Sequence, residues 1–201
     1  MPFVFGYGSL VDRTSIAVTL GRELGADEAP QPATLRGFRR AWNVASHSSG
    51  RPEYRLTTED GAPWSGWLGF LGLEETAEGA TIGAVFEIAS EELGLFDHRE
   101  RRYDRVEVTH AIDLWGGRHL QGRVYTYVPK ADVVSMARRE GAAVTVMARY
   151  LRLVDHAYRQ LGAEPYEAHV SSLPDPAPFG VREIIAEPID PDQVNQAVDP
   201  K

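Results

Sequence analysis

Two short segments of the sequence carry groups suited to chemistry, and the first is Gly6-Tyr7-Gly8-Ser9-Leu10. It follows a short apolar run that predicts a buried strand, and it precedes a stretch that predicts a helix. Backbone N–H groups at a glycine-rich turn that opens a helix form a cradle for an anion. The segment therefore predicts a site for a phosphate, a carboxylate or a developing oxyanion. The alternative interpretation is a tight turn that needs glycine for its geometry alone.

The second segment is a charged run at residues 95–106, which lies between an apolar helical turn and an apolar strand. Because both flanks are apolar, we expect some of these charges to lie at the rim of the core or in a cleft. Burial raises the pKa of a carboxyl group, which can then serve as general acid and general base. Composition does not rank the three candidates, Asp97, Glu100 and Asp104. The arginines between them are suited to hold an anionic substrate.

Other kinds of chemistry are disfavoured by what the sequence lacks. The chain has no cysteine, which excludes disulfides, thiolate catalysis and iron–sulfur clusters. Ser9 lacks the second glycine of a nucleophile elbow, and Val11 occupies the third position of a dinucleotide-binding fingerprint. The histidines show no metal-ligand spacing. We therefore expect neither a protein nucleophile nor a bound metal.

Composition and charge narrow the class of protein. The chain has 201 residues, 43% of them hydrophobic and 25% charged, as in an ordinary globular protein. Its net charge of −8 argues against a nucleic-acid or membrane partner. The sequence contains no apolar run of bilayer length and no basic region before its first apolar residues. We expect a cytoplasmic monomer or homodimer that binds a small molecule.

The predicted elements alternate between strands and helices in an α+β order, with no domain boundary before residue 173. A Pro-rich tail at 174–201, with a short strand at 181–185, is expected to pack on the same domain. Strands are predicted at 3–5, 33–44 with a glycine kink, 64–73, 81–88, 103–114 and 119–128, the last two paired through Gly116-Gly117. Helices are predicted from a cap at Asp12 or Thr14 to residue 21, from a start at Ser90, at 146–161 and at 167–171. In the helix that starts at Ser90, we expect the side chains of Leu93, Leu95 and Phe96 to face the core.

Taken together, these segments resemble the γ-glutamylcyclotransferase-like superfamily over about residues 3–173. The loop at 4–10 resembles the superfamily's Tyr-Gly-Ser loop. Residues 96–100, with 103–108 after them, are similar to its Leu-Asp-x-x-Glu segment and the strand that follows. Residues 83–86 and 124–128 match two further strands. The resemblance implies a small mixed β-barrel flanked by helices, with the loop and a glutamate at one mouth.

The implied reaction is an intramolecular aminolysis that needs no metal and no cofactor. The free α-amino group of a γ-glutamyl compound attacks its own γ-carbonyl, which releases 5-oxoproline and an amine or amino acid. The catalytic glutamate of the superfamily maps onto Glu100. The resemblance implies that the backbone N–H groups of Gly8, Ser9 and Leu10 bind the substrate α-carboxylate or the oxyanion. It also implies that the hydroxyl groups of Tyr7 and Tyr103 bind the glutamyl moiety.

Two questions stay open at the level of sequence. The first question is the leaving group, because Arg101-Arg102 replace a Gly-Gly pair of the glutathione-degrading branch. The substrate is glutathione, a γ-glutamyl amino acid, γ-glutamyl-ε-lysine or a γ-glutamylated metabolite intermediate. The competing function is a non-catalytic module that binds a small molecule or a partner in the Gly-Tyr-Gly-Ser-Leu cradle.

Overall fold

The computed structural model of the chain describes residues 1–51, 53–117, 120–137, 143–176 and 179–189. Its strands are β1 (Phe3–Gly6), β2 (Gln31–His47), β3 (Tyr54–Thr58), β4 (Trp67–Glu87), β5 (Tyr103–Glu107), β6 (Ile112–Leu114), β7 (Val124–Pro129), β8 (Val144–Met147), β9 (Gly180–Arg182) and β10 (Ile184–Pro188). The α-helices are α1 (Arg13–Leu20), α2 (Leu93–Arg99), α3 (Ala131–Ala137), α4 (Ala148–Leu161) and α5 (Ala163–Ser172). Single 3-10 turns are η1 (Ser9–Val11), η2 (Ser48–Gly50), η3 (Ser90–Glu92) and η4 (Thr109–Ala111).

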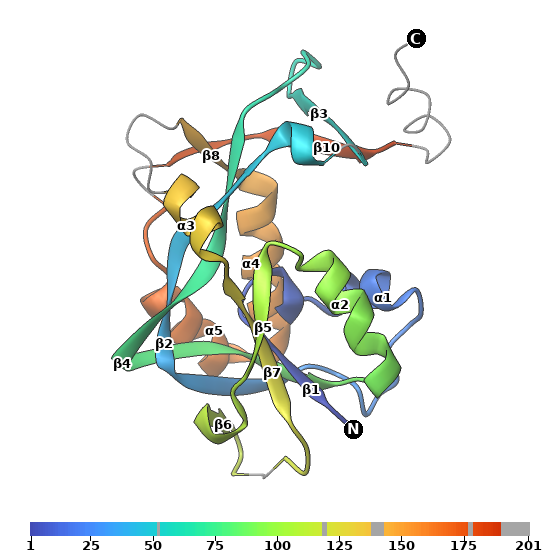
Figure 1. Cartoon of the computed structure of the whole chain (residues 1–201), viewed down its shortest axis with the longest axis vertical. Coiled ribbons are helices and arrows are strands. Elements are labelled where there is room, and N and C mark those ends of the chain that lie inside the picture. Colours follow the sequence, from blue (N-terminus) through green and yellow to red (C-terminus); the bar gives the residue numbers. More distant parts are fainter. Residues whose placement is uncertain (52, 118–119, 138–142, 177–178, 190–201) are drawn as a thin grey trace.

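A mixed sheet forms the centre of the molecule. Its strands run in the order β5-β7-β1-β4-β2-β6, and β8 and β9 extend it from β4. β1 is antiparallel to β4 and parallel to β7. The sheet curls into a half-barrel, with α1 beside α2 on one flank and α4 beside α5 on another (Figure 1). The predicted α+β class, with a small mixed barrel-like sheet flanked by helices, is confirmed.

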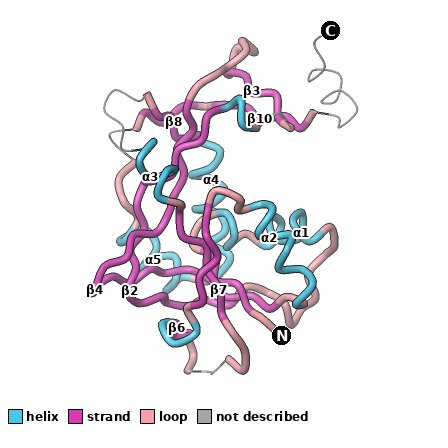
Figure 2. The backbone as a smooth tube through the Cα atoms, in the orientation of Figure 1, coloured by secondary structure: helices cyan, strands magenta, loops and turns pink. Residues whose placement is uncertain are grey.

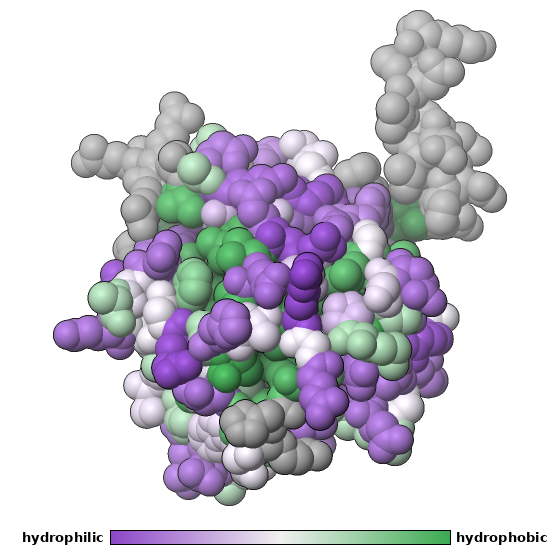
Figure 3. Space-filling view, turned by 60° about the horizontal axis from the view of Figure 1, so that its bottom comes forward, coloured by the Kyte–Doolittle hydropathy of each residue, from purple (hydrophilic) through white to green (hydrophobic). Residues whose placement is uncertain are grey.

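Apolar side chains cover β1 on both faces. Phe5 belongs to a cluster with residues of β2, β4 and α4, among them Tyr158, whereas Val4 packs with Ile16 and Phe96 from α1 and α2. This division follows from the strand geometry, in which successive side chains face opposite sides. Burial on both faces holds the end of β1, and with it the loop that follows, in one position. The side of the molecule drawn in Figure 3 has hydrophobic residues near its middle and polar residues around them.

The predicted strands at 64–73 and 81–88 are one continuous strand, β4, and the separation is wrong. Within the polar stretch, Glu74, Glu75 and Ala80 pair with Arg39, Phe38 and Arg36 of β2, whereas residues 76–79 have no partner there and form a bulge in β4. The register between the two strands shifts from Arg36 to Phe38, around Gly37, whose φ of 82° suits glycine. The predicted glycine kink in β2 is therefore confirmed. Figure 2 shows the two long strands running side by side toward the β3–β10 pair.

Other predicted boundaries also differ. β5 pairs with β7 as expected, but the strand predicted at 103–114 is broken by η4, and β6 pairs with β2 instead. His119, the predicted start of the last strand, lies outside the described residues. Val146 lies in β8, because a short buried strand shows the same apolar run as a helix start. Leu95 is 44% exposed and points outward, whereas Phe96 is fully buried.

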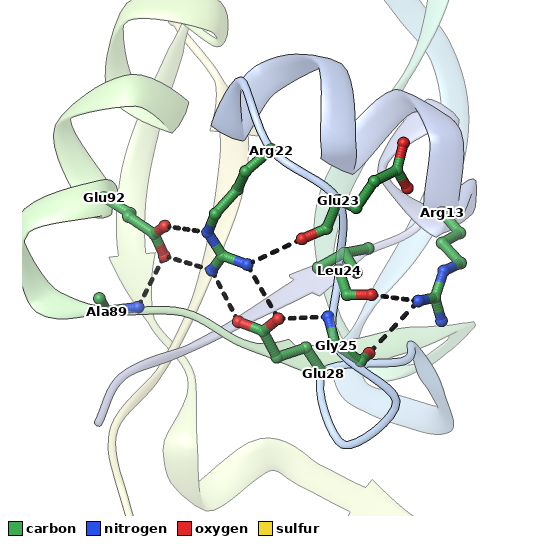
Figure 4. Close-up of polar contacts among 8 residues, drawn as sticks. All are labelled: Arg13, Arg22, Glu23, Leu24, Gly25, Glu28, Ala89 and Glu92. Atoms are coloured by element: carbon green, nitrogen blue, oxygen red, sulfur yellow. Dashed lines mark hydrogen bonds and ion pairs between the residues drawn. The ribbon is translucent and has the colours of Figure 1, made fainter.

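An arginine-centred network fastens the segment after α1 to the start of α2 (Figure 4). The Arg22 guanidinium donates hydrogen bonds to Glu28 and Glu92, and the Glu92 carboxylate also accepts from the backbone N–H of Ala89. These contacts hold the pKa of the Glu92 carboxyl below its ordinary value, mainly through Arg22. The network therefore fixes α2, which ends at the candidate catalytic residue, against α1.

The described part of the tail joins both sheets. β9 pairs with β8 and β10 pairs with β3, in the region where a short strand is predicted at 181–185. Residues 177–178 and 190–201 lie outside the described part, and the division into a domain at 1–173 and a tail at 174–201 stays a prediction. None of the described helices has the length and apolar character needed to cross a membrane.

Candidate functional site

The loop after β1 needs glycine at two positions because other parts of the chain approach it closely. A Cβ atom at Gly6 would lie 2.4 Å from the Leu10 carbonyl oxygen, and one at Gly8 would lie 2.8 Å from the Tyr150 hydroxyl. Neither glycine has a positive φ, so close contact is the reason for both. The loop then turns into η1 and α1, whose first turn is capped by the Asp12 carboxylate accepting from the Ser15 N–H at 2.7 Å.

Glu100 stands where α2 ends and the chain turns into β5. Its N–H donates to the Phe96 carbonyl at 2.8 Å, and its own carbonyl accepts from the Tyr103 N–H at 2.7 Å. This tight turn brings Glu100 and Tyr103 to the same side. The Glu100 side chain is 15% exposed. Burial raises the pKa of its carboxyl above the ordinary value, while the adjacent Arg99 guanidinium opposes the shift.

A small pocket joins the two segments singled out in the sequence. Its volume is about 40 Å³, and it is lined by the loop, α2–β5 and the aromatic residues around them: Phe5, Tyr7, Gly8, Ser9, Leu10, Leu71, Glu100, Tyr103, Tyr127 and Tyr150. All six predicted site residues are in this lining. Among the described residues of the lining, Glu100 is the one with a charged side chain. The pocket therefore places a single buried carboxyl group opposite a glycine-rich turn.

The two predicted binding tyrosines are both hydrogen-bonded within the protein. The Tyr7 hydroxyl donates to the Tyr127 carbonyl at 2.7 Å, and the Tyr103 hydroxyl donates to the Leu71 carbonyl at 3.3 Å. Burial raises the pKa of both phenols well above the ordinary value, so both stay neutral. A hydroxyl that already donates keeps its lone pairs free. Toward a ligand, each tyrosine is therefore suited to accept a hydrogen bond, as from an ammonium group.

Arg99 connects the loop, α1 and Glu100. Its Nε donates to Glu100 at 2.9 Å, and its Nη2 donates to the hydroxyls of Ser9 at 3.0 Å and Ser15 at 2.9 Å. Its Nη1 donates to the Ser15 carbonyl at 2.7 Å. One guanidinium thus orients the Glu100 carboxyl and the Ser9 side chain together. The sequence places Arg99 beside Glu100 but carries no sign of these further partners.

The other candidate carboxylates lie away from the pocket. Asp97 forms an ion pair with Arg105 at 2.7 Å and accepts from the Tyr127 hydroxyl. The Asp104 side chain is 68% exposed and lies 4.0 Å from Lys130. The structure therefore ranks Glu100 first among the three. Within the described ranges, no cluster of three or more potential metal-ligating side chains occurs.

Comparison with known proteins rests on structure. No protein-family model matches the sequence, and no curated protein sequence matches it. A solved structure described as a gamma-glutamyl cyclotransferase superposes with a TM-score of 0.53 at 15% identity, over 97% of this chain and 96% of the other. The chain has the γ-glutamyl cyclotransferase fold. The predicted resemblance is confirmed at this level.

Two further solved structures share the γ-glutamyl cyclotransferase fold. An uncharacterised protein from Homo sapiens superposes with a TM-score of 0.53 at 16% identity, over 97% of this chain and 96% of that one. YkqA from Bacillus subtilis superposes with a TM-score of 0.50 at 20% identity, over 86% of this chain and 55% of that one. The likeness spans nearly the whole chain in the first case.

Sequence reasoning missed three residues that surround the site in this γ-glutamyl cyclotransferase fold. Tyr150, in the first turn of α4, faces Gly8 and packs edge-on against Phe70. Tyr127 closes the pocket from β7, and Arg51 approaches from the segment after β2. In the sequence, Tyr150 and the helix to Gly162 resemble a Tyr-rich helical segment of the superfamily, which gives Tyr150 no role in the site, and Arg51 stands in a polar loop with no motif. These residues reach the site through tertiary packing.

Proposed function

We propose that the chain is a γ-glutamylcyclotransferase-like enzyme. The substrate's α-amino group attacks its own γ-carbonyl, the amide bond to the leaving amine breaks, and 5-oxoproline is released. The observation that carries this proposal is the single buried carboxyl group, Glu100, in a pocket lined by the Gly-Tyr-Gly-Ser-Leu turn. The fold shared with a structure described as a gamma-glutamyl cyclotransferase supports it.

The proton balance needs one acid–base group. The Glu100 carboxylate takes a proton from the α-ammonium group, which frees the attacking lone pair. The same proton then passes from Glu100 to the nitrogen of the leaving amine as the amide bond breaks. Ring closure releases a second proton from the attacking nitrogen; the Glu100 carboxylate takes it in turn and passes it to the released amine, which departs as its ammonium form. A raised carboxyl pKa suits both steps, because it lies closer to neutral pH and the group takes up the proton more readily than an ordinary carboxylate. The reaction needs no nucleophile from the protein.

The remaining groups of the pocket position the substrate. The hydroxyls of Tyr7 and Tyr103 accept hydrogen bonds from the α-ammonium, as their own donation to carbonyls leaves them acceptors. The first N–H groups of the η1 turn, at Ser9 and Leu10, bind the α-carboxylate, which leaves the γ-carbonyl near Glu100. Holding the flexible glutamyl chain in a ring-closing shape supplies a further part of the rate.

The direct test is mass-spectrometric detection of 5-oxoproline. The purified protein is incubated with glutathione, γ-glutamyl-alanine and γ-glutamyl-ε-lysine. We expect 5-oxoproline with an equal amount of amine from at least one of them. Ligands that raise the melting temperature without any turnover would instead favour the binding module. Absence of both turnover and binding would leave the loop as a structural turn and contradict the proposal.

Replacing Arg99 with methionine is expected to move the acidic limb of the kcat/KM profile to higher pH. The Arg99 guanidinium holds the Glu100 pKa down, while burial holds it up. Without this guanidinium, only the smaller effects of Arg51 and Arg102 oppose burial, so the Glu100 carboxyl becomes ionised at higher pH. Activity that requires the carboxylate is then lost sooner as the pH falls. The measurement is kcat/KM against pH for both proteins, and an acidic limb that stays in place or moves to lower pH contradicts the assignment of Glu100.

A further inference from the structure

A second, larger cavity adjoins the Glu100 pocket. It has a volume of about 260 Å³, and it shares Ser9, Glu100, Tyr103 and Tyr150 with the smaller one. Because Glu100 lines both, a substrate whose scissile amide lies at Glu100 extends into both cavities. The smaller cavity has room for roughly three water-sized groups, which suits the polar end of the glutamyl moiety. The larger cavity then receives the leaving group.

Two arginines give this larger cavity an excess of positive charge. Its lining contains Arg51, Arg99 and Arg102 but only one carboxylate, Glu100, and that carboxylate is paired with Arg99. Among the residues that the structure describes, neither Arg51 nor Arg102 has a carboxylate within ion-pair distance, although Glu53 acts on both from farther away. Two positive charges therefore stand in the cavity without a close counter-ion.

Arg51 is held in a way that leaves donors for a ligand. Its guanidinium lies over the Phe70 ring, with the carbon 4.7 Å from the ring centre. Its Nε is buried and has no hydrogen-bond partner among the described atoms. Burial lowers the pKa of Arg51, and burial together with the charge of Arg51 lowers that of Arg102. An anion between the two guanidinium groups would offset the burial and the mutual repulsion of these two positive charges.

We propose that Arg51 and Arg102 form a subsite for a carboxylate on the leaving amine, so that the protein selects γ-glutamyl amino acids or peptides over uncharged γ-glutamyl amides. This inference rests on the proposed function. Guanidinium groups bind carboxylates through paired, charge-assisted hydrogen bonds. A third, more open groove continues outward past Arg51 and Arg102 and is lined further out by Val18, Tyr54 and Leu95. It gives a peptide longer than one residue a path to solvent.

The test compares two substrates that differ only in the charge of the leaving group, γ-glutamyl-alanine and γ-glutamyl-alaninamide. We expect the native protein to prefer the acid by about tenfold or more in kcat/KM, the effect of hydrogen bonds to a charged group. In Arg51→Met and Arg102→Met this preference is expected to fall toward one, mainly through loss of the acid's kcat/KM. The methionine side chain still packs on Phe70 in place of Arg51. Arg123→Met is the matched control, because that side chain is 73% exposed.

Three outcomes overturn the subsite. In the first, the native protein shows no preference for the acid. In the second, both substitutions leave the kcat/KM values of the two substrates, and so the preference, unchanged. In the third, the substitutions lower kcat/KM by the same factor for both substrates. The last result would place the arginines at the glutamyl end instead. If neither substrate yields 5-oxoproline, the subsite is decided by calorimetric binding of the same two compounds, and the proposed function fails only if glutathione and γ-glutamyl-ε-lysine also yield none. Tighter binding of the acid that depends on Arg51 and Arg102 supports it, and equal binding contradicts it.

Discussion

Replacement of Glu100 with glutamine is expected to lower kcat by about 10²–10⁴-fold, the range that general acid–base catalysis contributes. Glutamine has nearly the same shape and still accepts a hydrogen bond from Arg99, but it takes no proton from the α-ammonium. Because the substrate is held by other groups, KM is expected to change little. The measurement is steady-state 5-oxoproline formation with the substrate found most active for the native protein.

Stability separates a chemical role of Glu100 from a structural one. Burial raises the Glu100 pKa in the folded state, so the folded state binds more protons than the unfolded state near that pKa, and its stability falls as the pH rises. Glu100→Gln removes this penalty, and its melting temperature at neutral pH is expected to equal or exceed that of the native protein. Asp104→Asn is the control, since the Asp104 side chain is 68% exposed. An unfolded Glu100→Gln protein, or one with near-native turnover, would remove Glu100 from the mechanism.

Replacement of Gly83 with alanine is expected to destabilise the fold by about 3 kcal/mol, at the upper end for overpacking a core. A Cβ atom at Gly83 would lie 2.2 Å from the Gly6 carbonyl oxygen and 2.6 Å from the Phe5 ring. Backbone cannot move aside as a flexible side chain does, so β1 must separate from β4. That movement also shifts the loop after β1, and we expect the remaining folded protein to lose activity. Chemical denaturation and 5-oxoproline formation measure the two effects.

Gly94 supplies the matched control for this substitution. It lies in α2, and nothing stands within 4 Å of a Cβ atom placed there. Gly94→Ala is expected to stabilise the protein by about 0.5–1 kcal/mol, the usual gain from alanine over glycine inside a helix. Equal stability of the Gly83 and Gly94 variants would show that the close approach of β1 and β4 is not what requires glycine.

Local signals made part of the site predictable. The loop glycines and the carboxylate-bearing run stand next to apolar segments, and each of these patterns lies within a dozen residues. The helix cap at Asp12 is equally local, because its partner is the N–H of Ser15. Gly21 ends the same helix with a φ of 67°, as its position predicts. Features of this kind are decided by neighbours in the chain.

What escaped prediction depends on distant partners. β4 continues past a bulge at 76–79 because β2 pairs with it on both sides of Gly37, and no property of 74–80 alone reveals this. The residue types alone could not rank Glu100 above Asp97, which the resemblance did, since the physical difference lies in the Arg105 ion pair and in burial. Arg51 and Tyr150 enter the site from separate elements, and their roles depend on packing that no spacing in the sequence encodes.

The central claim is that the substrate closes on itself, and an isotope experiment tests it most directly. The reaction is run to completion in water enriched in oxygen-18, and the products are analysed by mass spectrometry. Attack by the α-amine predicts 5-oxoproline without the label, in equal amount to the released amine, and a rate of formation about 10²–10⁴-fold lower with Glu100→Gln. Glutamate carrying oxygen-18 in place of 5-oxoproline would mean that water is the nucleophile, and it would contradict the account.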